Sequence, residues 1–166
     1  MPFMREIQAA ELTNVVKKLC IEANCYLPRD VKERIEHCRE EEPWEHAREI
    51  LDRIVENYRI ADRRDQPICQ DTGVACVFLK IGQEVHINGD LTEAINEGVR
   101  QGYAEGYLRK SVVADPLRRV NTGDNTPAML YTEIVPGDQI EVTVAPKGFG
   151  SENMSAVKML RPSVGV

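Results

Sequence analysis

The feature that most constrains this chain is an uninterrupted apolar run from Val74 to Leu79. A run of this length bounded by turn residues is typical of a buried strand. It follows Pro67, which lacks an amide hydrogen and disfavours helix at the preceding residue, and the polar segment Cys69-Gln70-Asp71-Thr72-Gly73. The sequence therefore predicts a loop with a thiol, an amide, a carboxylate and a hydroxyl at the start of a central strand, a usual position for functional groups.

Apolar residues at helical spacing dominate the chain before this loop. They predict one helix from Glu6 to about Ala23, which ends before Pro28, and a second from Arg29. A third begins near Trp44 and has the longest amphipathic stripe. We therefore expect three helices, each with one face against other parts of the protein.

Strand patterns dominate the chain after the loop. A short strand from Val85 to Ile87 leads to a helix from Leu91 to about Tyr107. Glycines recur every fourth residue along that helix, at Gly98, Gly102 and Gly106. Because each glycine costs about 1 kcal/mol relative to alanine in a helix, the row predicts close contact with another backbone.

Three further elements are expected towards the C-terminus. A short strand lies around Ser111 to Val113. Segments from Ala128 to Val135 and from Gln139 to Ala145 flank a Pro136-Gly137-Asp138 turn and predict a hairpin. Met154 to Leu160 predicts a helical turn.

This order of elements predicts an α+β fold, with N-terminal helices followed by a mainly antiparallel or mixed sheet and one intervening helix. The length of 166 residues fits a single domain over residues 1–166, with residues 1–65 helical and residues 66–166 of mixed strands and helix. The chain has 27 acidic and 21 basic residues, a formal net charge of −6. This balance argues against a nucleic-acid partner, and the absence of a long apolar run argues against a membrane protein.

Five cysteines without a regular framework suit free thiols in a reducing compartment, so we expect a cytoplasmic protein. Cys20, Cys38 and Cys76 fall on apolar faces and fit the role of small hydrophobic residues. Cys69 differs because polar residues surround it in the predicted loop, although a buried structural thiol is the alternative. The three histidines have no metal-ligand spacing to one another.

Two other features are weak when taken alone. The bend with Gly148 and Gly150 can present amide hydrogens to an anion, but a plain strand-to-helix turn explains it equally well. Arg109 can clamp a carboxylate through its planar guanidinium, or can be a solvated helix end. Neither feature identifies a ligand without further information.

Three separated motifs together are more specific. They are Pro67-Ile68-Cys69-Gln70-Asp71-Thr72-Gly73, Asn121-Thr122-Gly123-Asp124-Asn125-Thr126-Pro127 and Pro146-Lys147-Gly148-Phe149-Gly150-Ser151-Glu152-Asn153. In this order they resemble the iron–sulfur hydro-lyases of the class I fumarate hydratase and L-tartrate dehydratase type. The resemblance covers nearly the whole chain and corresponds to the N-terminal part of the α subunit or α domain.

The resemblance implies a role for each of six residues. Cys69 corresponds to one of three cysteine ligands of a 4Fe–4S cluster, whose open iron acts as a Lewis acid on the substrate hydroxyl. Asp71 corresponds to a catalytic residue that aids proton transfer. Substrate-binding positions correspond to Gln70, Arg109, Gly148 and Gly150.

Two departures qualify this resemblance. The other two cluster cysteines lie further along in the family, and Phe149 replaces what is often a glycine. We therefore expect a truncated α-type domain that is inactive alone and that belongs with a β-type subunit or C-terminal domain in a homo- or hetero-oligomer. The expected reaction is reversible hydration of a small dicarboxylate, fumarate/malate rather than tartrate. The alternative is a non-catalytic assembly or regulatory module that binds a β-type hydro-lyase subunit.

Overall fold

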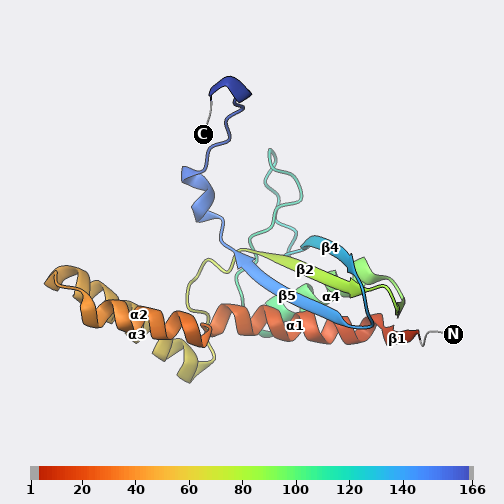
Figure 1. Cartoon of the computed structure of the whole chain (residues 1–166), viewed down its shortest axis with the longest axis horizontal. Coiled ribbons are helices and arrows are strands. Elements are labelled where there is room, and N and C mark those ends of the chain that lie inside the picture. The colour runs from red at the N-terminus through yellow and green to blue at the C-terminus, as the bar shows by residue number, and fades with distance from the viewer. Residues whose placement is uncertain (1–3, 165–166) are drawn as a thin grey trace.

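The computed structural model of the protein describes residues 4–164, apart from the side chains of residues 151 and 152, and has the element order of an α+β fold (Figure 1). The helices are α1 (Ala9–Cys25), α2 (Arg29–Glu41), α3 (Glu45–Arg64) and α4 (Leu91–Glu105). The strands are β1 (Arg5–Gln8), β2 (Val74–Gly82), β3 (Val85–Asn88), β4 (Met129–Val135) and β5 (Ile140–Lys147), and short 3-10 helices follow at η1 (Gly150–Met154) and η2 (Pro162–Val164). The predicted fold class is confirmed.

Strand β2 lies at the centre of a three-stranded mixed sheet with the order β4-β2-β5. It pairs in parallel with β4 and antiparallel with β5, so that Phe78 lies opposite Tyr131 on one side and Thr143 on the other. Strands β1 and β3 form a separate parallel pair. The predicted hairpin between the last two strands is therefore wrong, because β2 lies between them.

The turn between β4 and β5 passes around the end of β2. The amide of Gly82 donates to the Gln139 carbonyl over 2.8 Å, and the amide of Gln83 donates to the Val135 carbonyl over 2.9 Å. A Cβ atom on Gly82 would lie 2.2 Å from the Gly137 carbonyl oxygen. Turn residues in a sequence show that the chain reverses direction, but they do not show that a third strand occupies the space between the two arms.

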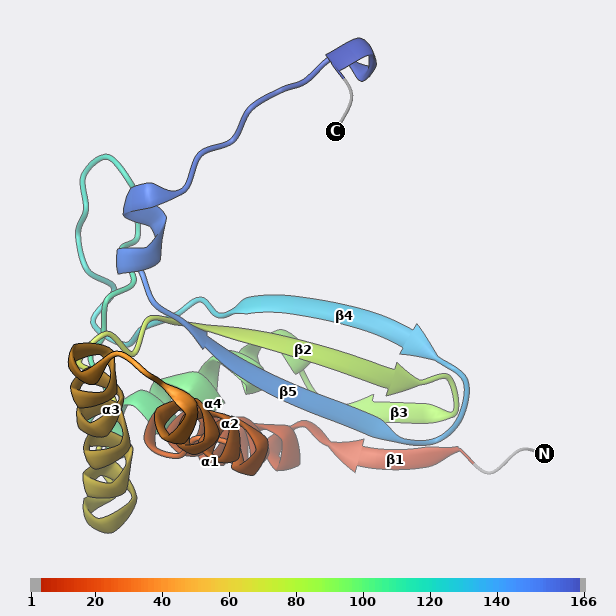
Figure 2. The same cartoon turned by 60° about the vertical axis from the view of Figure 1, so that its left-hand side comes forward.

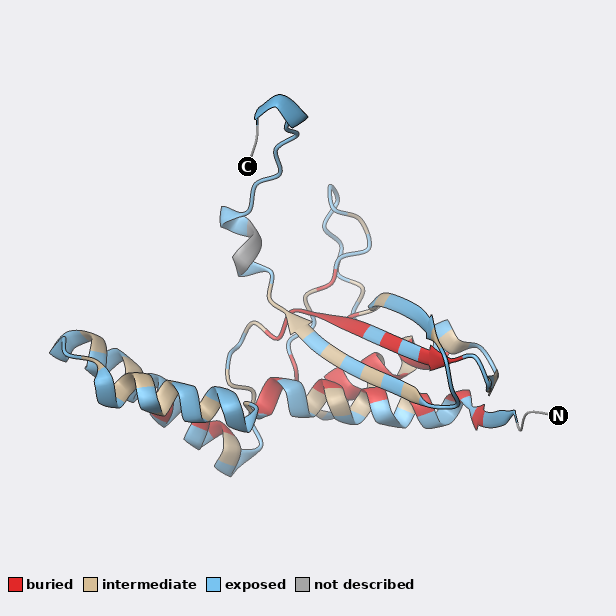
Figure 3. Ribbon diagram, in the orientation of Figure 1, coloured by how far each residue is buried: buried red, intermediate tan, exposed pale blue. Residues whose placement is uncertain are grey.

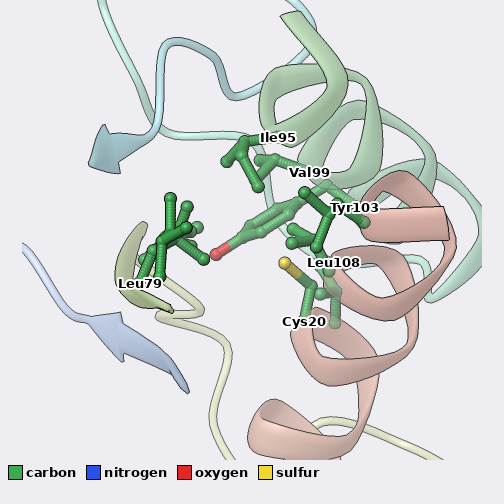
Figure 4. Close-up of a cluster of buried hydrophobic side chains, with 11 residues drawn as sticks. Cys20, Leu79, Ile95, Val99, Tyr103 and Leu108 are labelled. Atoms are coloured by element: carbon green, nitrogen blue, oxygen red, sulfur yellow. The ribbon is translucent and has the colours of Figure 1, made fainter. Parts of the chain in front are cut away.

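Helices α1 and α4 cover one face of the three-stranded sheet (Figure 2). Buried and exposed residues alternate from Val77 to Ile81 of β2, which Figure 3 shows as alternating bands, whereas Val74 to Val77 are buried without interruption. The largest core cluster combines all three elements, and Figure 4 shows the ring of Tyr103 extending from α4 towards Leu79 of β2. This core fixes the start of β2, and the loop before it, relative to the two helices.

The glycine row of α4 lies against α1, as predicted. A Cβ atom on Gly98 would lie 2.7 Å from the Thr13 carbonyl oxygen, and one on Gly102 would lie 2.9 Å from the Lys17 carbonyl oxygen. The two backbones thus approach too closely for any side chain at these positions.

Two helix boundaries differ from the predictions. The first helix begins at Ala9 because the Gln8 amide donates to the Glu11 carboxylate over 3.0 Å, and the residues before it form β1. Met154 to Leu160 is not helical beyond η1. Met154 and Val157 are 93% and 96% exposed, so this segment lacks the packing that stabilises short helices.

The predicted short strand at Ser111 to Val113 is also wrong. Val113 forms only an isolated bridge with Asn121. The amides of Ser111 and Val112 donate to the side chain of Asn125. Those two amides are therefore unavailable to a strand ladder.

Candidate functional site

The loop before β2 is tied to two helices by backbone and amide groups. The Asn57 amide group donates to the Ile68 carbonyl over 2.8 Å, and the Ile68 amide donates to the Asn24 carbonyl over 2.9 Å. Asn24 in turn donates to the Cys20 carbonyl of α1 over 2.8 Å. Residues 66–68 are therefore held between α1 and α3, and the residues that follow them start from a fixed point.

A pocket of about 690 Å³ opens beside this loop. It contains three of the predicted site residues, Cys69, Gln70 and Arg109. Its other lining residues are Arg64, Asp65, Gln66, Pro67, Thr72, Gly106 and Tyr107. The structure thus brings the predicted thiol, amide and guanidinium to one cavity, although residues 69 and 109 are far apart in sequence.

The pocket is positively charged in an otherwise acidic chain. Among the side chains that the structure describes, neither Arg64 nor Arg109 forms an ion pair. The carboxylate of Asp65 accepts a hydrogen bond from the hydroxyl of Tyr26, a residue that does not line the pocket. Two unpaired guanidinium groups in one cavity suit an anionic ligand.

Asp71 is directed towards the glycine bend rather than into this pocket. Its Oδ2 atom accepts a hydrogen bond from the Gly150 amide over 3.1 Å, and a Cβ atom on Gly148 would lie 2.9 Å from the same oxygen. The Asp71 amide in turn lies 3.4 Å from the Cys69 sulfur. The predicted residues therefore form two adjoining groups, Cys69 with Gln70 and Arg109, and Asp71 with Gly148 and Gly150.

Figures 1 and 2 show how the fold brings these groups together: the start of β2, the end of β5 and the base of the loop between α4 and β4 converge at one end of the sheet. Gly73 lies at this junction with a φ of 61°. The left-handed conformation and the closeness of the Lys147 carbonyl both favour glycine here.

The thiols differ in accessibility. Burial raises the pKa of Cys20 to about 12, and burial followed by the charge of Asp65 raises the pKa of Cys25. Cys76 is also buried, whereas Cys69 is exposed. The alternative of a buried structural thiol at Cys69 is therefore wrong, and Cys69 is available to a ligand.

The side chains present do not by themselves fit a complete cluster site. Among the described residues, no three His, Cys, Asp or Glu side chains are placed to hold a metal ion. Cys69 offers one thiolate, and one thiolate is too few for an iron–sulfur cluster.

No helix within residues 4–164 has the length and apolar character needed to cross a membrane.

Sequence reasoning missed several residues of this region. Arg64 at the end of α3 and Tyr107 after α4 both line the pocket. Asn125 is completely buried beneath the loop, although its sequence context marks it only as one member of a polar motif. Only the closeness of these residues in space identifies them, because their sequence patterns are those of a helix end and a polar loop.

Comparison with known proteins identifies the protein family to which this chain belongs. The sequence profile described as fumarate hydratase (Fumerase) matches residues 13–166. The chain belongs to this family of hydro-lyases, and the resemblance drawn from the three motifs is confirmed.

Individual relatives fall into two groups. A Methanocaldococcus jannaschii protein provisionally named L(+)-tartrate dehydratase subunit alpha is 42% identical over 94% of this chain and 57% of its own length. The L(+)-tartrate dehydratase subunit alpha of Escherichia coli K12 is 27% identical over 93% of this chain and 52% of its own length. The anaerobic class I fumarate hydratase of the same strain is 37% identical over 68% of this chain and 21% of its own length. The chain thus spans little more than half of the two alpha subunits.

Proposed function

We propose that this chain is the α-type part of a hydro-lyase that reversibly adds water to, or removes it from, a small dicarboxylate. The observation that carries the proposal is the single pocket containing Cys69, Gln70 and Arg109 in a chain of the fumarate hydratase family. The two unpaired arginines of that pocket suit a substrate with two carboxylates. The preference for fumarate/malate over tartrate stays a prediction, because the named relatives include both activities.

In this proposal, some residues of the site bind the substrate and another transfers a proton. Arg109 binds one carboxylate through its guanidinium, and Gln70 donates or accepts a hydrogen bond beside it. Asp71, which adjoins the pocket without lining it, is the proposed proton-transfer group, and the Gly150 amide holds its carboxylate in place. Gly148 leaves space against that carboxylate, so the bend can approach the same ligand.

Cys69 is the proposed contribution of this chain to a 4Fe–4S cluster. The proposal rests on its exposure in the pocket and on the family, and it requires the remaining ligands to come from residues outside this chain. The alpha-subunit names of two relatives support a β-type partner or C-terminal domain that completes the site.

The experiment is co-expression of the chain, fused to the C-terminal part of an α subunit of this family, with a β-type subunit. Hydration of fumarate and dehydration of L-tartrate are measured in parallel on the anaerobically reconstituted assembly. We expect Cys69→Ala to abolish turnover and to lower the iron content, whereas Cys38→Ala, a partly buried cysteine on α2, preserves both. Full activity in Cys69→Ala would exclude the ligand role.

A non-catalytic module that binds a β-type subunit is the second candidate. The observation in its favour is the single exposed thiol among the described residues, without a complete set of metal ligands. The same co-expression separates the two functions. A stable complex without turnover of either dicarboxylate, unaffected by Cys69→Ala, would support the module.

A further inference from the structure

A buried asparagine connects the two sides of the candidate site. Asn125 has no exposed surface, and its side-chain oxygen accepts hydrogen bonds from the amides of Ser111 over 2.7 Å and of Val112 over 3.1 Å. Its side-chain nitrogen donates to the Gly73 carbonyl over 3.0 Å. One amide group thus joins the end of the Cys69–Gly73 loop to the segment that follows Arg109.

Two more hydrogen bonds reinforce this connection. The Thr72 hydroxyl donates to the Arg109 carbonyl over 3.0 Å. The Tyr103 hydroxyl donates to the Thr72 carbonyl over 2.7 Å and lies 3.2 Å from the Gly73 carbonyl. Burial raises the pKa of Tyr103, so the phenol stays protonated and remains a donor. We call Asn125, Thr72 and Tyr103 the polar clamp.

The clamp is anchored to the core helix α4. Tyr103 belongs to this helix and lies in the main core cluster (Figure 4). On either side of Asn125, the Arg100 guanidinium donates to Asp124 over 3.2 Å, and the Ala128 amide donates to the Asn96 side chain over 2.9 Å. The position of Asn125 is therefore set by the core as well as by the loop that carries it.

We propose that Asn125 is a positioning residue, which with Thr72 and Tyr103 fixes Cys69 and Gln70 on one side of the pocket relative to Arg109 on the other. The proposal rests on the proposed hydro-lyase function, because it names the device that sets the geometry of that site. Asn125 does not line the pocket and acts through the two segments that it joins.

The expected kinetic effect follows from the geometry. The clamp holds Thr72 and Arg109, which line the pocket, and residues 73, 111 and 112, which lie within three positions of them in the chain. A misplacement of about 1 Å in a reacting group costs on the order of 10²-fold in rate. Loss of the Asn125 bonds should therefore reduce turnover without removing any group that touches the substrate.

The first test uses Asn125→Asp and peptide-resolved hydrogen exchange on the full chain. The new carboxylate keeps the acceptor for Ser111 and Val112 but loses the donor to Gly73 and places negative charge against that carbonyl. We expect exchange to rise at least about tenfold in residues 69–74 and 109–112, with α1 and the centre of β2 unchanged. Unchanged exchange in both segments, or an equal rise throughout the chain, would overturn the proposal.

Asn96→Asp is the matched control. It introduces the same charge on a partly buried side chain and keeps an acceptor for the Ala128 amide. We expect its exchange in residues 69–74 and 109–112 to match the unmodified chain. A rise equal to that of Asn125→Asp would show a general charge effect and overturn the proposal.

The second test uses Thr72→Val and Thr72→Ser in the reconstituted assembly. It tests the positioning role of the clamp even when Asn125→Asp fails to fold. Thr72→Val should lower kcat on the order of 10²-fold with a smaller change in KM and should raise hydrogen exchange in residues 109–112, which loss of a substrate contact alone would not do. Thr72→Ser should restore both because its hydroxyl can still donate to the Arg109 carbonyl. Equal kcat values in all three proteins would overturn the positioning role. An unmodified assembly that turns over no dicarboxylate would instead remove the proposed function, while hydrogen exchange still decides whether the clamp exists.

Discussion

At the scale of single residues, Gly73 shows why two distant motifs share one site. Its φ is 61°, and a Cβ atom there would lie 2.0 Å from the Lys147 carbonyl oxygen. The residue therefore permits the Cys69–Gly73 loop to lie directly against the strand end that leads to Gly148. The sequence places a glycine at this turn, but only the structure shows which backbone it faces.

Replacing Gly73 with alanine should be strongly destabilising. The left-handed conformation costs an L-residue roughly 1–2 kcal/mol, and the clash with Lys147 adds to this cost, so we expect a loss of more than about 2 kcal/mol in the free energy of unfolding. Gly123→Ala is the matched control, because Gly123 has a φ of 83° and a Cβ atom there would have no neighbour within 4 Å. Urea denaturation should show the larger loss for Gly73→Ala, and equal losses would contradict the close approach to Lys147.

Cys69 should be the first thiol to react with iodoacetamide in the folded protein. The thiolate is the reactive form, and burial raises the pKa of both Cys20 and Cys25. We expect alkylation of exposed Cys69 to be at least about tenfold faster than that of these two thiols, measured by mass spectrometry of peptides. In urea the three rates should converge, and equally fast reaction of Cys25 in the folded chain would contradict its burial.

At the scale of elements, the helices show which structural features a sequence pattern can predict. The stripe beginning at Trp44 and the glycine row of α4 predict elements that the structure confirms, because both depend on helical period alone. The β4–β5 hairpin is wrong because its local turn residues carry no information about β2 lying between the strands. Likewise, the exposure of Cys69 depends on how α3 packs against the loop, and no local sequence pattern predicts that packing.

The loop after α4 depends on Asp124, and this dependence should appear as a pH effect on stability. Partial burial acts to raise the pKa of Asp124, but hydrogen bonds from the Thr126 amide and hydroxyl and from Arg100 outweigh it and lower the pKa from 3.8 to about 2. A carboxyl group with a lower pKa in the folded state stabilises the fold fully above its ordinary pKa, and this contribution is lost as the pH falls through the folded value.

The stability difference between the unmodified chain and Asp124→Asn should therefore be largest above pH 3.8 and should shrink towards pH 2. Thermal unfolding of both proteins over this range measures the difference. The asparagine keeps a side-chain oxygen for Thr126 but loses the ionic contact with Arg100. A difference that stays constant across this range would contradict the lowered pKa.

At the scale of the whole molecule, the hydrophobic core and the candidate site occupy different regions of the same arrangement of sheet and helices. Helices α1 and α4 cover one face of the sheet, while Phe78 and Tyr131 stack at 5.0 Å between ring centroids and remain about half exposed. The α2–α3 pair and the segment after β5 extend away from this body (Figure 1). The pocket lies where the loop after α3 meets the sheet, so its shape depends on how the projecting helices are anchored.

The overall charge makes a further prediction about this pocket. The chain has a formal net charge of −6, which opposes the approach of a dicarboxylate, whereas Arg64 and Arg109 provide a local attraction. In the assembled protein, we expect Arg64→Gln to weaken fumarate binding about tenfold, measured by calorimetry. Arg63→Gln is the matched control, because it removes the same charge one residue earlier on α3 and Arg63 does not line the pocket.

Salt separates the local effect from the overall charge. The screening length falls from about 30 Å at 0.01 M salt to about 3 Å at 1 M, so added salt weakens attraction between the pocket and a dicarboxylate. We expect fumarate binding to weaken with salt in the unmodified assembly and in Arg63→Gln, and to weaken less in Arg64→Gln, which has already lost part of that attraction. If Arg63→Gln and Arg64→Gln reduce affinity equally at low salt, the net charge of the molecule determines binding, and Arg64 has no specific place in the pocket.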